Sequence, residues 1–574
     1  MAFWVFGWSK AKIRVYNKNR MQKKSLIFLF LILLLAASLR FFRLSIIPPG
    51  LFGDEVDTGY QAYSILRTGK DYFGNFLPVH FQSFGDWRVP LYIYLDTVFV
   101  AMLGLSELAV RLPSAILGIL GVLLAFFLVK KITSDEKISL LSAFLLSVSP
   151  WHIQISRVGL EAIFLPVLFP AGLILFWRGK DEKKAVWLVL SALCLGLTPY
   201  AYSTPKLFLP LLVLLLFLLW GKELGKQKKK LVIFLTTLAL VLLPLGLNLI
   251  KGSGQARFLG ISIFSNPEIP ERVRQARQNC DYQGGLARIL HNKVTFWIDD
   301  FSKNYLSSIS TDFLSGKGDP NPRHSVGSRG ELYLWELPFL LLGLGLTIFK
   351  AFKEKDKIYQ FILGWLVLAP VPAALTIGGG THALRLFLFL PWLQVLTALG
   401  IFSVWEFFKS KRIKILYVTC LTLLASVSLF LYLHQYFVHY PKVSGRWWNY
   451  GYREIFDYVK KVESKYQKIN ISPSWEPSIV YTLFYSQYPP EKTQKEITIS
   501  AVDIGKYHFL SPDLGRVKRG EGEKKTLYVL NPAELEIANL KLKDSPEVKF
   551  IKDIKAPDGS TAFVIFSSAD VLTK

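Results

Sequence analysis

Long apolar runs dominate the first three quarters of the chain, and short polar loops separate them. Runs such as 231–250 and 383–405 carry hardly any charge, and each is long enough to cross a hydrocarbon core of about 30 Å as a helix. The pattern predicts an all-α polytopic membrane protein with about eleven transmembrane helices. We expect these crossings at 25–44, 108–129, 138–153, 160–177, 185–200, 204–220, 231–250, 331–349, 358–376, 383–405 and 413–433.

The basic residues are concentrated in loops on one side of these crossings. The chain has 574 residues and a formal net charge of +26, a balance that could indicate a nucleic-acid partner. Six short loops, however, hold 27 of the Lys and Arg residues against seven acids, and this placement is typical of loops that stay in the cytoplasm. We therefore expect a basic arm at 1–24 in the cytoplasm, multi-pass insertion in the cytoplasmic membrane, and no nucleic-acid binding. The six loops are 9–24, 130–137, 178–184, 221–230, 350–357 and 409–414.

The apolar stretch 89–105 is predicted to stay outside the bilayer core. If it crossed together with 108–129, every later basic loop would face outward, against the positive-inside rule. Asp96 near its middle also fits partial burial better than contact with lipid. We therefore expect an outer juxtamembrane helix here, within an outer loop at 46–107, and a second long outer loop at 251–330.

The tail from 434 to 574 differs in composition from the rest of the chain. It opens with the helix-like YREIFDYVKKVESKY and continues with alternating apolar stretches such as KTLYVLN and TAFVIFSS, which are typical of strands. We expect a small extracytoplasmic α/β or α+β domain that follows a transmembrane domain over 25–433.

With this topology, charged residues gather on the outer side. Asp54 and Glu55 follow the first crossing in GLFGDEVDTGY, and Glu161 stands where the fourth crossing begins. An acid at the edge of a crossing indicates a functional site by default, whereas Asp54 and Glu55 taken alone could form an ordinary solvated turn. The basic side chains on the same side are Arg88, Arg111, Arg157, Lys206, Arg323 and Arg385, with His324 and His382.

Two acidic centres with several cations suit a reaction on an anionic, lipid-anchored substrate. Arginines can neutralise a phosphate leaving group with two parallel hydrogen bonds, and a carboxylate can deprotonate or orient the attacking hydroxyl. Each of Arg157, Lys206 and Arg385 taken alone could equally anchor a lipid headgroup. Because nucleotide sugars stay in the cytoplasm, an outward-facing sugar transferase would need a lipid-linked donor.

Metal and thiol chemistry have little support in the pattern. The three cysteines form no CxxC pair, so neither a disulfide framework nor a thiolate metal site is expected. His434 and His439 are five positions apart, off one face of an α-helix, which argues against a metal pair. His382 can be a ligand, an acid–base group or the partner of a neighbour. We assign no metal ligand and no certain cofactor, and a divalent metal stays an open alternative.

Several segments resemble a known family. They are GLFGDEVDTGYQAYSILRTG, RVPLYIYL, ELAVRLPSAILG, SPWHIQISRVGLEA, RHSVGSRGELYLWELPFLLLG and HALRLFLFLPWL. Together they are similar to bacterial members of the protein O-mannosyltransferase and lipid A aminoarabinose transferase group, which are glycosyltransferase 39-like enzymes of the GT-C class that use polyprenyl-phosphate sugars. The resemblance covers residues 25–405 and implies a GT-C-like membrane domain.

The resemblance also implies roles for individual residues. Asp54 and Glu55 match the acidic motif of the first outer loop, and Glu161 matches the second acidic position, where the group often has Asp. We expect Asp54 to be the base or the acceptor-orienting carboxylate, Glu55 to help to shape the site, and Glu161 to be a second acidic contact. The residues expected to hold the lipid phosphate are Arg111, which matches the family's arginine, together with Arg157, Lys206 and Arg385.

The predicted function is the transfer of a sugar from a polyprenyl-phosphate donor to an acceptor at the outer face of the membrane. The acceptor can be a protein, a lipid or a cell-wall glycan, and the chain lacks the sugar-binding insert of the eukaryotic enzymes. A ligase or polymerase that moves a whole glycan from a lipid is the main alternative, and product size would distinguish the two. A transporter or flippase would need acids in mid-span and broken helices in inverted halves, which the apolar runs do not show. A purely structural protein leaves the clustering on one face unexplained.

Overall fold

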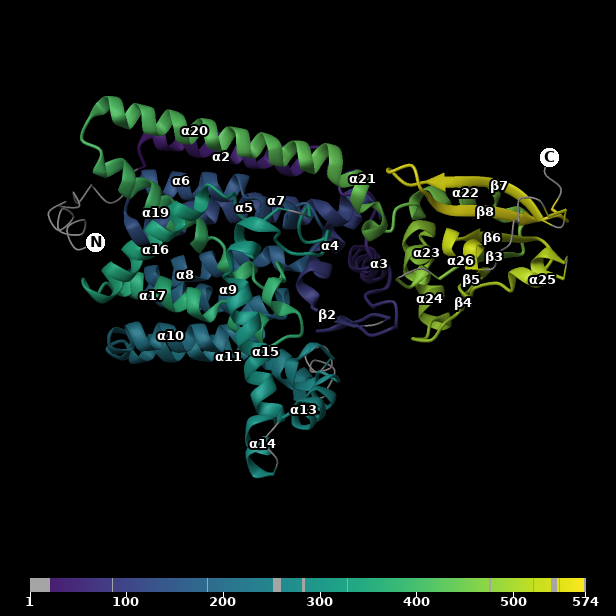
Figure 1. Ribbon diagram of the computed structural model, residues 1–574, viewed down its shortest axis with the longest axis horizontal. Coiled ribbons are helices and arrows are strands. Elements are labelled where there is room, and N and C mark those ends of the chain that lie inside the picture. Colours follow the sequence, from purple (N-terminus) through teal and green to yellow (C-terminus); the bar gives the residue numbers. More distant parts are fainter. Residues whose placement is uncertain are drawn as a thin grey trace.

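The computed structural model describes residues 21–571 except 85, 183, 251–259, 281–283, 328, 474–475, 520, 538–544 and 547. Most of the predicted cytoplasmic arm at 1–24 therefore lies outside the described residues. Figure 1 shows a long helical block and, at the opposite end of the molecule, a smaller domain with a β-sheet that contains the C-terminus.

In the described part of the chain, eleven helices lie where the eleven crossings were predicted. Seven segments are long and apolar enough to span a membrane by length and composition; the other four helices, α6, α9, α16 and α19, have 13 to 17 residues. The helices are α2 (Lys23–Phe41), α5 (Glu107–Thr133), α6 (Glu136–Val148), α8 (Leu165–Glu182), α9 (Ala185–Ala201), α10 (Pro205–Gly225), α11 (Lys228–Ile250), α16 (Glu336–Phe352), α17 (Lys357–Leu368), α19 (Trp392–Phe407) and α20 (Lys411–His434). The chain is thus a multi-pass membrane protein.

The surface of α20 shows why this block needs a bilayer. Only 6% of the apolar window that contains α20 is buried, and Leu416, Leu423 and Phe430 are 62%, 64% and 67% exposed. Soluble proteins rarely expose a contiguous apolar surface of this kind. We conclude that this face contacts lipid.

One predicted crossing begins later than expected. Residues 387–389 form a 3₁₀ turn (η6), and α19 begins only at Trp392. Pro391 lacks an N–H group, so it suits the start of a helix rather than its interior. The turn before Pro391, which carries His382 and Arg385, is therefore not part of the helix.

The outer loop predicted at 46–107 is largely helical. It contains α3 (Gly53–Thr68), α4 (Pro90–Leu103) and a two-stranded antiparallel sheet of β1 (Phe81–Gln82) and β2 (Trp87–Arg88). With 14 residues, α4 is about 21 Å long, which is shorter than the hydrocarbon core. It packs against α3, α5 and α9.

The second long loop also contains helices, and several short elements connect the longer ones. In Figure 1, the helices of the loop at 251–330 project from the helical block. The elements of this loop are η3 (Ile263–Ser265), α13 (Ile269–Gln278), α14 (Gly285–Leu290), α15 (Lys293–Ser308) and the π-helical turn η4 (Asp312–Gly316). The short connecting elements elsewhere are α7 (Pro150–Ile155), η2 (Glu161–Phe164), α18 (Val371–Ala374), η5 (Gly379–Thr381), η7 (Gln435–His439), α21 (Tyr440–Ser444) and η8 (Gly445–Trp448).

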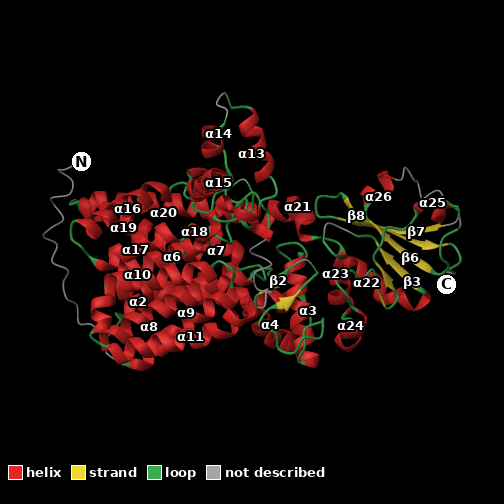
Figure 2. Ribbon diagram, turned by 90° about the horizontal axis from the view of Figure 1, so that it is seen from below, coloured by secondary structure: helices red, strands yellow, loops and turns green. Residues whose placement is uncertain are grey.

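The tail forms the predicted small α/β domain, whose helices lie around a six-stranded mixed sheet (Figure 2). The strand order is β4-β5-β3-β6-β8-β7, and β3 pairs in parallel with β5 and β6 while the other pairs are antiparallel. Helices α23 and α24 pack on α3, so the domain lies directly against the acidic motif. The strands are β3 (Lys468–Ile471), β4 (Asp503–Ile504), β5 (Tyr507–His508), β6 (Thr526–Leu530), β7 (Val548–Lys555) and β8 (Thr561–Ser568). The helices are α22 (Tyr452–Val462), η9 (Glu463–Lys465), α23 (Ser478–Ser486), α24 (Pro490–Glu496), α25 (Leu514–Lys518) and α26 (Pro532–Ile537).

Candidate active site

Two buried arginines hold the chain segment that leads into α3. Arg111 on α5 donates to three main-chain carbonyls between Leu44 and Gly50. Arg157, which follows α7, donates to four main-chain carbonyls between residues 39 and 47. Both arginines are 0% exposed, and these hydrogen bonds are with the chain itself. These contacts position the segment before Asp54, and the assignment of the two arginines to the lipid phosphate stays a prediction.

Glu55 is the counter-charge of Arg111. Both side chains are 0% exposed, and Nε and Nη2 of Arg111 donate to the two carboxylate oxygens at 2.8 and 3.0 Å. The N–H of Gly159 donates to the same carboxylate at 2.9 Å. A Cβ atom at position 159 would lie 2.8 Å from Val110, so this close approach requires glycine. Glu55 is therefore enclosed by Arg111 and Gly159, and its predicted role in shaping the site stays a prediction.

Asp54, unlike its neighbour, faces solvent. It lies in the first turn of α3 with 41% of its side chain exposed, where the helix dipole favours a negative charge. Nη2 of Arg88 lies 2.8 Å from its Oδ1, and Nε of Arg88 contacts Oδ2 of Asp57. Asp57 is buried and also accepts hydrogen bonds from Tyr72 and Ser83. Asp57 thus fixes Arg88, and Arg88 fixes the orientation of Asp54.

Arg88 is the cation on which the charges of several acids act. Burial lowers the pKa of Arg88, but Asp54, Asp57 and Glu161 outweigh it and raise this pKa well above its ordinary value. Arg88 therefore keeps its positive charge. Glu161 is half-buried at the start of η2, directly before α8. Asp54 pairs directly with Arg88, and Glu161 lies within electrostatic range of the same guanidinium.

Lys206 and Arg385 are the half-buried cations among the predicted phosphate ligands. Nζ of Lys206, in the first turn of α10, lies 3.2 Å from Nε2 of His80. Burial and this ammonium group lower the pKa of His80 to about 4, so the imidazole is neutral at pH 7. Arg385 donates through Nη1 to Oγ1 of Thr376 at 2.6 Å. Neither cation is enclosed in the way Arg111 is.

Arg323 connects the C-terminal domain with the start of α3. Its Nη2 lies 2.6 Å from Oε1 of Glu476, and its guanidinium carbon lies 5.0 Å from the ring centre of Phe52. Oε2 of Glu476 accepts the main-chain N–H of Gly53 at 2.5 Å. Sequence reasoning offered Arg323 as a candidate but missed Glu476, since no pattern in the tail indicates which residue meets the membrane domain.

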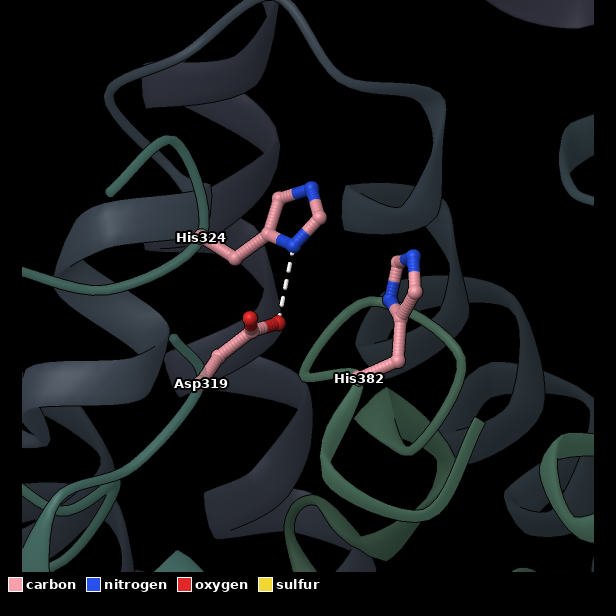
Figure 3. A group of neighbouring side chains, drawn as sticks. All are labelled: Asp319, His324 and His382. Atoms are coloured by element: carbon pink, nitrogen blue, oxygen red, sulfur yellow. Dashed lines mark hydrogen bonds and ion pairs between the residues drawn. The ribbon is translucent and has the colours of Figure 1, made fainter. Parts of the chain in front are cut away.

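The two predicted histidines come together around an aspartate that sequence reasoning missed (Figure 3). Asp319 and His324 lie in the loop between η4 and α16, and His382 follows η5. Ligand atoms of the three side chains lie within 4.8 Å of one another, and the two imidazole centres are 4.6 Å apart. Asp319 stands five positions before His324 in GDPNPRH, and this proximity in the sequence could have indicated Asp319 as a candidate ligand. Two imidazoles and a carboxylate form a donor set that suits a divalent transition metal.

His434 and His439 were expected to lie on different faces of an α-helix, but their rings lie close together. The rings of His434 and His439 are 4.8 Å apart, because η7 is a π-helix and brings positions five apart onto one face. Among the described residues, no third ligand accompanies this pair.

Comparisons with known proteins support the resemblance found in the sequence. Residues 88–247 match the sequence family described as dolichyl-phosphate-mannose-protein mannosyltransferase. YycA of Bacillus subtilis (strain 168), named as a candidate mannosyltransferase, is 24% identical over 177 residues, which cover 30% of this chain and 26% of YycA.

Two solved structures share the fold. ArnT from Cupriavidus metallidurans, in the apo state, aligns with a TM-score of 0.52 and 10% identity over 96% of this chain and 98% of its own. The oligosaccharyltransferase AglB from Archaeoglobus fulgidus, in complex with an inhibitory peptide and a dolichol-phosphate, aligns with a TM-score of 0.50 and 13% identity. That alignment covers 81% of this chain and 64% of AglB. The chain is thus a multi-pass membrane protein with the GT-C glycosyltransferase fold, and over residues 88–247 its sequence is similar to the dolichyl-phosphate-mannose-protein mannosyltransferases.

Proposed function

We propose that the chain is a glycosyltransferase that moves a sugar from a polyprenyl-phosphate donor to an acceptor on the outer face of the cytoplasmic membrane. The observation that carries this proposal is the exposed carboxylate of Asp54, which Arg88 holds at 2.8 Å at the start of α3. Of the three acids on α3, only Asp54 has a substantially exposed carboxylate, since Glu55 and Asp57 are buried. The structure of AglB with a dolichol-phosphate indicates that such a fold accommodates a lipid of this class.

In the proposed reaction, the acceptor hydroxyl attacks the anomeric carbon of the lipid-linked sugar. The new bond joins that carbon to the acceptor oxygen, the bond between the carbon and the phosphate oxygen breaks, and polyprenyl phosphate leaves with the electron pair. The acceptor proton passes to the carboxylate of Asp54, which Arg88 orients. Glu161, whose charge acts on the same guanidinium, would stabilise the positive charge that develops on the sugar ring.

The leaving phosphate needs cations that the substrate can reach. Since Arg111 and Arg157 are enclosed, this role passes to Lys206 and Arg385, which remain half-buried. We propose that their charges, rather than those of the two buried arginines, neutralise the phosphate as the bond breaks.

The test compares Asp54→Asn with wild type in membranes that contain a radiolabelled polyprenyl-phosphate sugar. Asparagine keeps the shape of the side chain and loses the proton acceptor, so we expect transfer to fall about 100-fold or more. Asp558→Asn, at an exposed position in the C-terminal domain, is the matched control and should transfer normally. Equal transfer by Asp54→Asn and wild type would overturn the role of Asp54. Wild-type membranes that release no label from any polyprenyl-phosphate hexose or pentose would overturn the donor.

A further inference from the structure

Two buried carboxylates and two imidazoles meet where the loop before α16 contacts the turn after η5. Asp319 is 3% and Glu331 is 1% exposed. Oε1 of Glu331 accepts the main-chain N–H of Asp319 at 3.1 Å, and this bond helps to hold the Asp319 segment in place. A buried carboxylate beside two imidazoles is a donor group that a divalent transition-metal ion can use.

The donor atoms already face one another. Oδ2 of Asp319 lies 2.8 Å from Nδ1 of His324 and accepts the main-chain N–H of Ala383 at 2.8 Å. His382 is the neighbour of Ala383, and Figure 3 shows its ring beside the carboxylate of Asp319 and the ring of His324. The three ligands therefore come from two segments more than 50 positions apart in the sequence, and a bound ion would join these segments.

The spacing is suitable for a metal ion. Ligand bonds to zinc are about 2.0–2.2 Å long, so two donor atoms of a tetrahedral site stand about 3.4 Å apart. The donor atoms here lie within 4.8 Å of one another, and side-chain shifts of about an ångström would bring them to that spacing. A histidine ligand binds a metal ion as the neutral imidazole, and a carboxylate ligand binds it in the ionised form.

We propose that Asp319, His324 and His382 bind one divalent transition-metal ion of the zinc type, which ties the loop before α16 to the turn after η5. Two imidazole nitrogens and one carboxylate oxygen are the set that such ions prefer over magnesium or calcium. Three protein ligands leave a fourth position for water.

The ion would act on the active site through the neighbouring residue. Arg323 immediately precedes His324, and its guanidinium pairs with Glu476 against Phe52, at the start of α3. A metal that fixes His324 therefore also fixes the loop that presses Arg323 onto the helix carrying Asp54. This role is positional, and it does not depend on which sugar or acceptor the protein uses.

The experiment uses the full chain purified in detergent, stripped with EDTA and then titrated with Co²⁺ or Zn²⁺. We expect wild type to bind one equivalent of Co²⁺ with visible ligand-field absorption, and Zn²⁺ to raise its melting temperature. His382→Gln and His324→Gln should lose both responses. His439→Gln is the matched control, because it removes a histidine from an exposed pair that has no carboxylate partner among the described residues.

Metal uptake by wild type and the histidine variants either supports or overturns the proposed site. Metal uptake by wild type and His439→Gln, with loss in His382→Gln, supports the site. A wild-type protein that binds no metal, or equal uptake by wild type and His382→Gln, overturns it, and so does loss of uptake in His439→Gln. If His324→Gln does not fold, His382→Gln decides the question, because His382 is only half-buried and its folding can be checked by size-exclusion chromatography. Metal content and melting temperature need no substrate, so this result is independent of the proposed transfer reaction.

Discussion

Glu55→Gln tests whether the second acid of the motif is a structural counter-charge or a reacting group. Glutamine keeps the size of the side chain but removes the charge that faces Arg111, and both positions are 0% exposed. Removing one partner of a buried ion pair costs about 3–5 kcal/mol, because the remaining charge stays buried without compensation. We therefore expect Glu55→Gln to lower the free energy of unfolding by about this amount.

The matched control is Glu136→Gln. Glu136 pairs with Lys130 at 2.7 Å, but these side chains are 20% and 29% exposed, so the loss should stay at about 0–1 kcal/mol. Unfolding of both variants in detergent can be followed by tryptophan fluorescence during denaturant titration. Equal destabilisation of the two variants would refute the reasoning. A Glu55→Gln protein of normal stability that no longer transfers sugar would show instead that Glu55 takes part in the reaction.

Two further predictions follow from contacts around the site. Gly53→Ala should lower stability by about 1–2 kcal/mol and reduce transfer, because a Cβ would lie 2.6 Å from Oε2 of Glu476 and remove a hydrogen bond at the start of α3. Gly246→Ala, a glycine in α11 with open space around a Cβ, is its control in the same denaturation assay and should not lose stability. The pKa of His80 is about 4 in the folded protein against 6.5 ordinarily. Between about pH 6.5 and about pH 4, His80 binds a proton in the unfolded chain but not in the folded chain. The free energy of unfolding therefore falls as the pH drops through this range. His80→Gln should remove this part of the pH dependence, and an undiminished loss of stability between pH 7 and pH 5 in the variant would contradict the assignment.

Much of the membrane domain could be predicted from local patterns. Apolar runs and basic loops depend on the cost of burying charge in lipid, which acts on each segment separately, and the helices lie close to the predicted positions. The α/β character of the tail also followed from alternating apolar positions in segments such as TAFVIFSS. Boundaries were less certain, as the late start of α19 at Trp392 shows, because the effect of Pro391 competes with a continuous apolar run.

The candidate site was predicted in part. The sequence marked Asp54, Glu161 and Arg88 as residues of one face, and the family motif favoured Asp54 over Glu55 as the base. It could not show which of the two carboxylates is exposed or that Arg111 is enclosed. Burial decides these roles, and burial depends on segments that are distant in the sequence. Asp319 and Glu476 were missed for the same reason, since each acquires its partners only through the packing of separate loops.

The sequence by itself determined that this chain crosses a membrane many times and collects acids and cations on one side. Hydropathy and charge are properties of each residue, so membrane crossings can be predicted from them before the tertiary structure is known. Only the tertiary structure decided that Arg111 pairs with Glu55 inside the protein, that Arg88 joins Asp54 to Asp57, and that two histidines lie beside Asp319. These contacts depend on short distances between side chains of distant segments, and such distances exist only after the helices have packed.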